Sequence, residues 1–349
     1  MSRLLARTAA GGSEGGAAAS QPRRRISVPV MRFTPENTVI LAVTLVALGL
    51  RVYYQYTRPG FLLGVTEYDD GPYFGSAVRL VHGVLPYRDF VLVQPPGITL
   101  LMTPVGLLTY LTGTGPGLAI GRLLTVLAST AGVVLIGLLV RHRGALATLV
   151  ATGVLAVFDD AVSAAHTVLV EPWLVLFCLI GALATFDGDR LTSTTKRLVW
   201  GGVAFGVAGA FEGWAIVPVL IIVAMCLPDL RRAAKFAGGV AAGFIVPVLP
   251  FLIASPSQFY RSLITAQIGS RAHATRVGVW FRLRHFTGFA AALTWPHDLV
   301  MAVVVGIIAF IFIAYVISIQ VSHEFPAQLD WFAVVTAALV CAMFLWPPQ

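Results

Sequence analysis

Charged residues are scarce in this sequence of 349 residues. Aspartate, glutamate, lysine and arginine together make up only 11% of it, whereas soluble domains carry about 25%. Hydrophobic residues make up 57%, and the mean hydropathy is +0.84. The scarcity of charge excludes an ordinary soluble domain and indicates a polytopic membrane protein.

Cysteine and familiar catalytic motifs are also scarce. The three cysteines, Cys178, Cys226 and Cys341, lie in or beside apolar segments without metal-ligand spacing, so we interpret them as packed thiols. The absence of a Ser/His/Asp set and of a metal-binding helix motif argues against a hydrolase. The glycine-rich segment 113–117 lacks the Lys-Ser/Thr ending of a phosphate loop.

The net charge is +8, but the basic residues are scattered between apolar segments. This distribution excludes nucleic acid as a partner. Residues 1–35 are rich in Gly, Ala and Ser and contain Arg23, Arg24, Arg25 and Arg32. We predict a disordered basic tail that stays in the cytoplasm and anchors the first span, rather than a cleaved or twin-arginine signal.

Spanning helices need about 20 apolar residues each. Nine apolar segments suit this role, several of them short, and the loops assigned to the cytoplasm carry the arginines and lysines that the positive-inside rule requires. We therefore predict an all-α, polytopic transmembrane helical bundle of about nine spans, in the cell membrane, with its N-terminus in the cytoplasm. The expected spans are Thr38–Tyr56, Leu118–Val140, Ala145–Phe158, Val168–Phe186, Leu198–Phe211, Trp214–Leu227, Phe236–Ala254, Leu299–Gln320 and Ala327–Trp346.

The first long external loop covers residues 58–116. Within it, Gly71–His82 is amphipathic, and Pro95–Thr112 is apolar but interrupted by prolines. We expect both segments to form helices that lie on or dip into the outer surface of the membrane.

The second long external loop, residues 255–297, contains five arginines and no acid. A basic external loop runs against the orientation rule, although long loops obey it less strictly. One interpretation is a loop that faces solvent or anionic lipid. The other is a binding site for a lipid phosphate, because arginine makes bidentate phosphate contacts, and its candidates are Arg271, Arg276 and Arg282.

Acidic residues at the membrane surface are costly to bury, so they mark a candidate functional site. Asp69 and Asp70 follow the first span, with Glu67 nearby. Capping of a helix needs only one aspartate, and the side chains of neighbouring residues diverge. We therefore expect one of the two aspartates to face a substrate.

Further acids fall at the ends of expected spans. Asp159 and Asp160 either mark the membrane boundary or line the same cavity. Glu171 precedes a proline at a helix start, which helix-start chemistry largely explains. Glu212 lies in a tight turn between two half-length spans, where an acid needs a partner or water.

Four other residues are candidates for substrate binding. Tyr73 and Tyr87 combine an apolar ring with a polar hydroxyl. Arg88 precedes Asp89, with which it would simply pair in most proteins. His166 is a lone histidine near the outer surface, where histidines are more often structural than catalytic.

The order of these parts resembles the GT-C superfamily of membrane glycosyltransferases, in its actinobacterial type, over roughly residues 38–349. The resemblance implies a donor that carries its sugar on polyprenyl phosphate, and an acceptor that is a glycan or lipid of the cell envelope. Mannosyl- and arabinosyltransferases are the activities it suggests. The matching features are Asp69-Asp70, Gln94-Pro95-Pro96-Gly97, Arg122, Glu171-Pro172-Trp173, Glu212-Gly213-Trp214 and the run from Pro250 to Arg271.

This resemblance implies an inverting transfer on the external side. We expect Asp69 to act as base, Asp70 to orient it, and Arg271, Arg276 or Arg282 to stabilise the leaving phosphate. A divalent cation such as Mg²⁺ or Mn²⁺, held by Asp70 and Asp160, is compatible with this mechanism but not required by it.

Two departures from the family pattern weaken the expectation of activity. Many relatives carry Lys or Arg where this chain has Glu212, and they continue with more helices beyond the position of Gln349. We therefore also expect a shortened member. The alternatives are a non-catalytic relative or scaffold, and a transporter of lipid or solute, although internal repeats and mid-membrane acids would favour the latter.

Overall fold

A computed structural model describes residues 34–65, 67–265, 279–287, 294–322 and 327–345. All of them belong to one unit, Thr34–Gln349. The predicted basic tail lies outside the described residues except for its last two positions. Arg271 and Arg276 of the second external loop also lie outside them.

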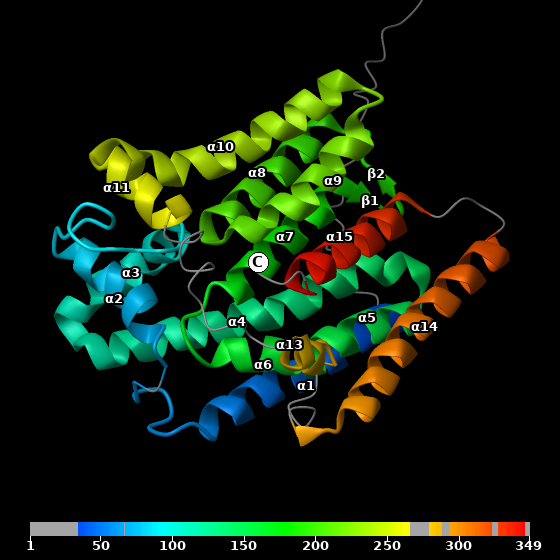
Figure 1. Cartoon of the computed structure of the whole chain (residues 1–349), viewed down its shortest axis with the longest axis horizontal. Coiled ribbons are helices and arrows are strands. Elements are labelled where there is room, and N and C mark those ends of the chain that lie inside the picture. The colour runs from blue at the N-terminus through cyan, green and yellow to red at the C-terminus, as the bar shows by residue number, and fades with distance from the viewer. Residues whose placement is uncertain (1–33, 66, 266–278, 288–293, 323–326, 346–349) are drawn as a thin grey trace, which may run out of the picture. The chain divides into compact units, whose positions relative to one another are not determined.

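Each of the nine expected spans coincides with a helix (Figure 1). The boundaries differ from the expected ones by a few residues, as helix ends often do. These helices are α1 (Pro35–Tyr56), α4 (Thr114–Val140), α5 (Ala145–Val157), α7 (Glu171–Thr185), α8 (Thr195–Phe211), α9 (Ile216–Cys226), α10 (Leu230–Ala254), α14 (His297–Ser322) and α15 (Gln328–Leu345).

The two predicted surface helices are also present, as α2 (Asp70–Val81) and α3 (Gly97–Thr112). Shorter helical pieces lie between the long helices. They are η1 (Arg141–Arg143), α6 (Asp159–Ser163), η2 (Ala164–His166), η3 (Gly213–Ala215), α11 (Pro256–Tyr260), the π-helical turn η4 (Arg261–Thr265) and α13 (Val279–Phe286).

Fewer helices than expected are long enough to cross a membrane. Within the described residues, Pro35–Tyr56, Thr114–Arg143 and Leu230–Ala254 qualify, and α5 with α6 forms a fourth candidate that is bent by 61°. The 15 residues of α7 extend only about 23 Å at 1.5 Å per residue, less than a hydrocarbon core of about 30 Å. The structure thus supports a helical membrane protein, and the number of nine spans is not confirmed.

Helices α8 and α10 pack together through glycines (Figure 1). A Cβ atom added at Gly206 would lie 2.1 Å from the carbonyl oxygen of Val240, and one added at Gly243 would lie 2.1 Å from that of Val203. Only glycine permits this close backbone approach, which is typical of small-residue helix contacts in membranes. The α8–α10 contact holds the turn that carries Glu212 in place.

A small β-hairpin departs from the predicted all-α fold. Strands β1 (Phe186–Asp187) and β2 (Arg190–Leu191) pair antiparallel in the polar loop before α8. Asp189, in its turn, accepts from Arg143 Nε at 2.8 Å, and its carbonyl oxygen accepts from the backbone N–H of Leu329 at 3.1 Å. The hairpin therefore joins the end of α4 to the start of α15.

Candidate functional site

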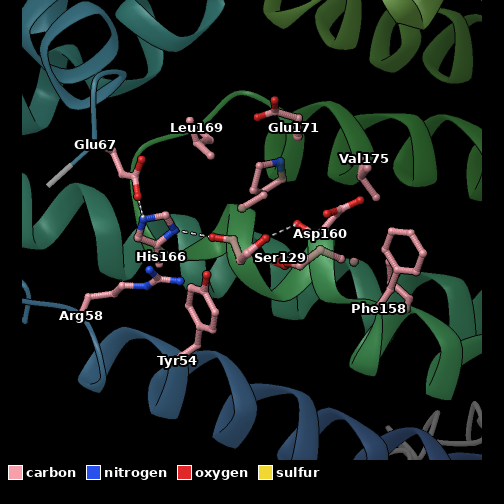
Figure 2. A pocket seen from close by; sticks show the side chains of 16 residues that line it. Tyr54, Arg58, Glu67, Ser129, Phe158, Asp160, His166, Leu169, Glu171 and Val175 are labelled. Atoms are coloured by element: carbon pink, nitrogen blue, oxygen red, sulfur yellow. Dashed lines mark hydrogen bonds and ion pairs between the residues drawn. The ribbon is translucent and has the colours of Figure 1, made fainter. Parts of the chain in front are cut away.

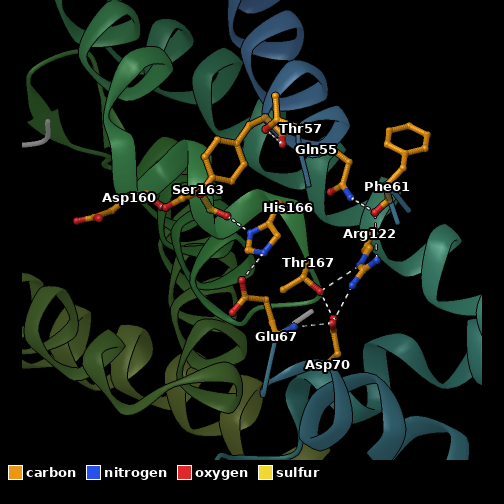
Figure 3. Close-up of polar contacts among 11 residues, drawn as sticks. Gln55, Thr57, Phe61, Glu67, Asp70, Arg122, Asp160, Ser163, His166 and Thr167 are labelled. Carbon is orange, nitrogen blue, oxygen red and sulfur yellow. Dashed lines mark hydrogen bonds and ion pairs between the residues drawn. The ribbon is translucent and has the colours of Figure 1, made fainter. Parts of the chain in front are cut away.

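The two adjacent aspartates diverge, as expected, and Asp70 is the buried one. Its Oδ2 lies 2.7 Å from Nη2 of Arg122, in a pair whose side chains are 2% and 1% exposed, with Arg122 the more buried (Figure 3). The hydroxyl of Thr167 donates to the other carboxylate oxygen. Arg122 also donates from Nη1 to the carbonyl oxygen of Leu62 at 2.7 Å. This pair fixes the start of α2 against α4 and the segment before α7.

This placement bears on the two roles expected of Asp70. Both of its carboxylate oxygens accept hydrogen bonds, from Arg122 and from Thr167, and the metal ion shared with Asp160 stays a prediction. Among the described residues, no group of three or more His, Cys, Asp or Glu side chains is arranged to hold a metal ion. Asp70 instead positions the backbone that carries Asp69.

A cavity lies beside this pair, between α1, α4, α6 and α7 (Figure 2). Its volume is about 720 Å³, within the range of about 300–1,000 Å³ that is typical of small-molecule sites. Its walls are apolar on the side of α5 and α7. The polar side chains that line it are Tyr54, Arg58, Glu67, Ser129, Asp160, Ser163, His166 and Glu171.

Three of the acids predicted from the sequence thus meet at one cavity. Glu67 comes from the first external loop, Asp160 from α6 and Glu171 from the start of α7. Asp159 is also in α6 but does not line the cavity. Neither Asp69 nor Asp70 is among the lining residues, so a cavity shared between Asp160 and the aspartate pair stays a prediction.

His166 and Glu67 form a pair at the cavity wall. Nε2 of His166 lies 3.1 Å from Oε1 of Glu67, and Nδ1 contacts the carbonyl oxygen of Ser163 (Figure 3). A carbonyl oxygen only accepts hydrogen bonds, so Nδ1 carries a proton. The imidazole is largely buried, and its Nε2 faces the Glu67 carboxylate at the cavity wall.

Arg58 supplies a positive charge to the cavity (Figure 2). Its guanidinium carbon lies 4.1 Å from the centroid of the Tyr54 ring, a cation–π arrangement. Its Nε is buried and has no hydrogen-bond partner among the described residues. A buried donor without a partner points to a ligand that accepts from it.

The sequence interpretation missed Arg58, although a signal was present. The arginine follows Tyr53, Tyr54 and Tyr56 at the end of the first span. Aromatic residues mark the membrane interface, and an arginine beside them lies at the depth of a lipid headgroup.

A second acidic group lies around Tyr73, at the starts of α2 and α7. Glu171 interacts electrostatically with both Asp69 and Glu212. Burial first, and then the charges of Glu67 and Asp70, raises the pKa of the Asp69 carboxyl above its ordinary range. Burial and the charge of Glu171 raise the pKa of Glu212 to about 7.

Burial and the nearby carboxylates also raise the pKa of the Tyr73 hydroxyl, which is hydrogen-bonded to Gln94. The turn that holds Gln94 is locked to the end of α8. A Cβ atom at Gly97 would lie 2.4 Å from the carbonyl oxygen of Ala210, so only glycine fits. This contact keeps Gln94 and Glu212 close to the same helix ends.

Several other candidates lie away from the cavity. Tyr87 is buried against Phe251 and Phe259, and its hydroxyl donates to the carbonyl oxygen of Gln94 at 2.6 Å. Arg88 is exposed and pairs with Asp89 at 2.9 Å, as the simpler interpretation predicted. Arg282 lies in α13 and does not line the cavity.

Arg51 is a further residue that the sequence interpretation missed. It is buried within α1 and donates from Nε to Ser129 at 2.7 Å. Its Nη1 and Nη2 donate to the carbonyl oxygens of Ala156 and Leu155, at 3.3 and 3.2 Å. These carbonyls belong to the last turn of α5, so Arg51 caps the helix where it bends into α6. An ionisable residue inside an apolar span is itself a functional signal.

Comparison with known proteins does not assign a function. No family model matches the sequence, and neither does any curated protein. Among solved structures, the chain is similar to the S. cerevisiae protein O-mannosyltransferase Pmt1-Pmt2 complex bound to the sugar donor, with a TM-score of 0.49 and 17% identity. The match covers 72% of this chain and 37% of that chain, so this chain spans little more than a third of its length. A likeness at this level assigns neither family nor activity.

Proposed function

We propose that this protein is a membrane glycosyltransferase of the GT-C type. It transfers a sugar from a polyprenyl-phosphate donor to a glycan or lipid acceptor of the cell envelope, on the external side of the cell membrane. The observation that carries this proposal is the cavity itself, where three carboxylates and one arginine meet at the ends of apolar helices. A donor with an apolar chain, a phosphate and a sugar requires this combination of surfaces.

The proposed reaction is a single displacement with inversion. The acceptor hydroxyl attacks the anomeric carbon of the donor sugar, a new carbon–oxygen bond forms, and the bond to the lipid phosphate breaks. The proton of the hydroxyl passes to a carboxylate, and the phosphate leaves with its lipid. The proposed base is Asp69, which does not itself line the cavity but interacts electrostatically with Glu171, which does. Its raised pKa brings it nearer to the range that suits proton transfer.

Arg58 is the proposed partner of the leaving phosphate. It lies at the cavity wall and has an unused donor, and a fixed guanidinium stabilises charge that develops on phosphate oxygens. It takes the role that the sequence assigned to arginines of residues 255–297. Arg271, Arg276 and Arg282 remain predictions for contacts with the rest of the donor or with the acceptor.

The proposed partners of the sugar and of the acceptor are polar side chains at or near the cavity. Glu67, which lies 3.1 Å from His166, and Asp160 present acceptors for sugar hydroxyls. Tyr73 and Glu171 interact electrostatically with Asp69. Mannose and arabinose are the sugars that the sequence resemblance favours.

The test is a transfer assay with purified protein and a radiolabelled polyprenyl-phosphate sugar. Asp69→Asn removes the base while preserving size, and we expect transfer to fall at least about 100-fold. The matched control is Asp89→Asn, an exposed aspartate of the same loop, which we expect to leave transfer unchanged. Wild-type activity in the Asp69 variant would overturn the assignment, and absence of transfer in the wild type would favour a scaffold or transporter.

A further inference from the structure

A groove lies at the opposite end of α7 from the cavity described above. Glu171, at the start of α7, lines the cavity, whereas Ile180 and Leu183, in its last two turns, line the groove. Leu135 of α4 forms another wall, and the start of α8 completes it. The groove has a volume of about 480 Å³.

The walls of the groove are almost entirely apolar. Ile180 is 37% exposed and Trp200 is 59% exposed, as expected for side chains that face lipid rather than protein. A flat helix surface contacts lipid chains nonspecifically. A concave surface between three helices instead holds one chain in place, because it contacts that chain on several sides.

The rim of the groove is basic. Lys196 is exposed and forms no ion pair among the described residues. Arg197 is already engaged, since its Nη2 donates to the carbonyl oxygens of Leu183 and Phe186 at 3.1 and 2.6 Å. Its Nη1 lies 3.4 Å from Asp187. Lys196 is therefore the rim cation with its charge uncompensated.

Lys196 and Trp200 are one helical turn apart on α8, so both side chains lie on the same face. An indole next to an ammonium group is typical of the level where lipid headgroups meet acyl chains. The helix α8 also begins here without a side-chain cap, which leaves first-turn N–H groups to other acceptors. Charge and apolar surface thus follow the order found in a lipid.

We propose that this groove binds an anionic glycerophospholipid. Its acyl chain lies against Leu135, Ile180 and Leu183, its phosphate contacts the Lys196 ammonium group, and the Trp200 indole lies at the level of its ester groups. The uncompensated charge of Lys196 favours an anionic headgroup over a zwitterionic one. This site is independent of the proposed transferase activity and needs only that the helices lie in a membrane.

The experiment measures quenching of tryptophan fluorescence in proteoliposomes. The probe is phosphatidylglycerol with brominated acyl chains, compared with phosphatidylcholine brominated in the same way. We expect stronger quenching by phosphatidylglycerol, and Trp200→Phe removes the saturable part of the signal. Lys196→Gln weakens binding, so that the fraction of phosphatidylglycerol needed for half-saturation rises about fivefold. This is the effect expected of one lysine near an anionic headgroup.

The matched control is Lys235→Gln, an exposed lysine of α10 that does not line the groove. We expect it to behave as the wild type. Equal quenching by the two lipids, or an unchanged Lys196→Gln titration, would overturn the proposal. Displacement of the brominated lipid by a polyprenyl phosphate at a lower fraction than by phosphatidylglycerol would overturn it as well, because the groove would then belong to the donor lipid.

Discussion

The buried pair of Asp70 and Arg122 determines the geometry of the first external loop. Both side chains are almost fully enclosed, and their contacts reach Leu62 and Thr167. Removal of one member leaves a buried charge without compensation, which costs about 3–5 kcal/mol. The pair is therefore a structural requirement for the position of Asp69.

We expect Arg122→Met to lower the stability of the protein by about 3–5 kcal/mol. The reason is that the Asp70 carboxylate stays buried without its partner. Thermal unfolding in detergent measures the change, and the double variant Asp70→Asn/Arg122→Met recovers part of it. An Arg122→Met protein as stable as the wild type would contradict the buried pair.

Glu212 gives a prediction about pH. Its pKa is raised from 4.5 to about 7 in the folded protein, so the folded state binds the proton more tightly than the unfolded state. Stability therefore falls as the pH rises from about 4.5 to about 7, and it levels off above that. We expect Glu212→Gln to remove this part of the slope, measured as melting temperature between pH 4.5 and 8.

The control for this experiment is Glu36→Gln, in the first turn of α1 and far along the chain from Glu212, which should keep the wild-type slope. A Glu212→Gln protein with the same dependence on pH as the wild type would show that this carboxyl group titrates normally.

At the residue scale, the sequence predicted the acids better than the arginines. Asp160 and Glu171 were named as candidates because acids at span ends are conspicuous, although a membrane boundary and helix-start chemistry were the alternatives. Arg51 and Arg58 were not assigned, since their roles depend on partners far along the chain. Arg51 contacts Ala156, 105 residues away, and no local pattern encodes that distance.

At the scale of elements, the contact between α8 and α10 depends on glycine. We expect Gly206→Ala to lower stability by about 1–3 kcal/mol, because the added methyl group overlaps the carbonyl oxygen of Val240. The matched control is Gly238→Ala, on the open face of α10, where a Cβ atom meets nothing within 4 Å. That change should stabilise the helix by about 0.5–1 kcal/mol.

Thermal unfolding of the two alanine variants decides the point. Opposite shifts in melting temperature are expected, and equal shifts would contradict the close approach of the two backbones. Because α8 ends at the turn that carries Glu212, loss of this contact is also expected to disturb the acidic group around Tyr73.

Elements were the most predictable level of the structure. A helix was found at the position of every expected span and of both expected surface helices, since apolar composition and length report helices directly. The hairpin at Asp189 was not predicted, because its few strand residues carry no periodic pattern. Its stability comes instead from Arg143, Arg197 and the start of α15.

At the scale of the whole molecule, the number of membrane crossings differs from the expectation. Hydropathy identifies apolar helices, but it does not tell a short span from half of a broken one. The bend between α5 and α6, capped by Arg51, is an example of two helices that together form one candidate crossing. The orientation of the chain remains a prediction from the positive-inside rule.

The molecule has two chemically distinct ends. The cavity end gathers carboxylates, Arg58 and the starts of α2 and α7. The hairpin end gathers basic residues, of which Arg143 pairs with Asp189 and Asp330, and Arg197 lies near Asp187. The proposed transfer belongs to the first end and the proposed lipid site to the second.

Equilibrium binding of a polyprenyl-phosphate sugar tests the central proposal most directly. We predict that Arg58→Gln weakens binding at least about tenfold, as expected for the loss of a charge-assisted contact with phosphate. Arg88→Gln, an exposed arginine of the same loop that pairs with Asp89 outside the cavity, should bind as the wild type does. Equal affinities for the donor in the wild type and in Arg58→Gln would contradict the assignment of this cavity to the lipid-linked sugar.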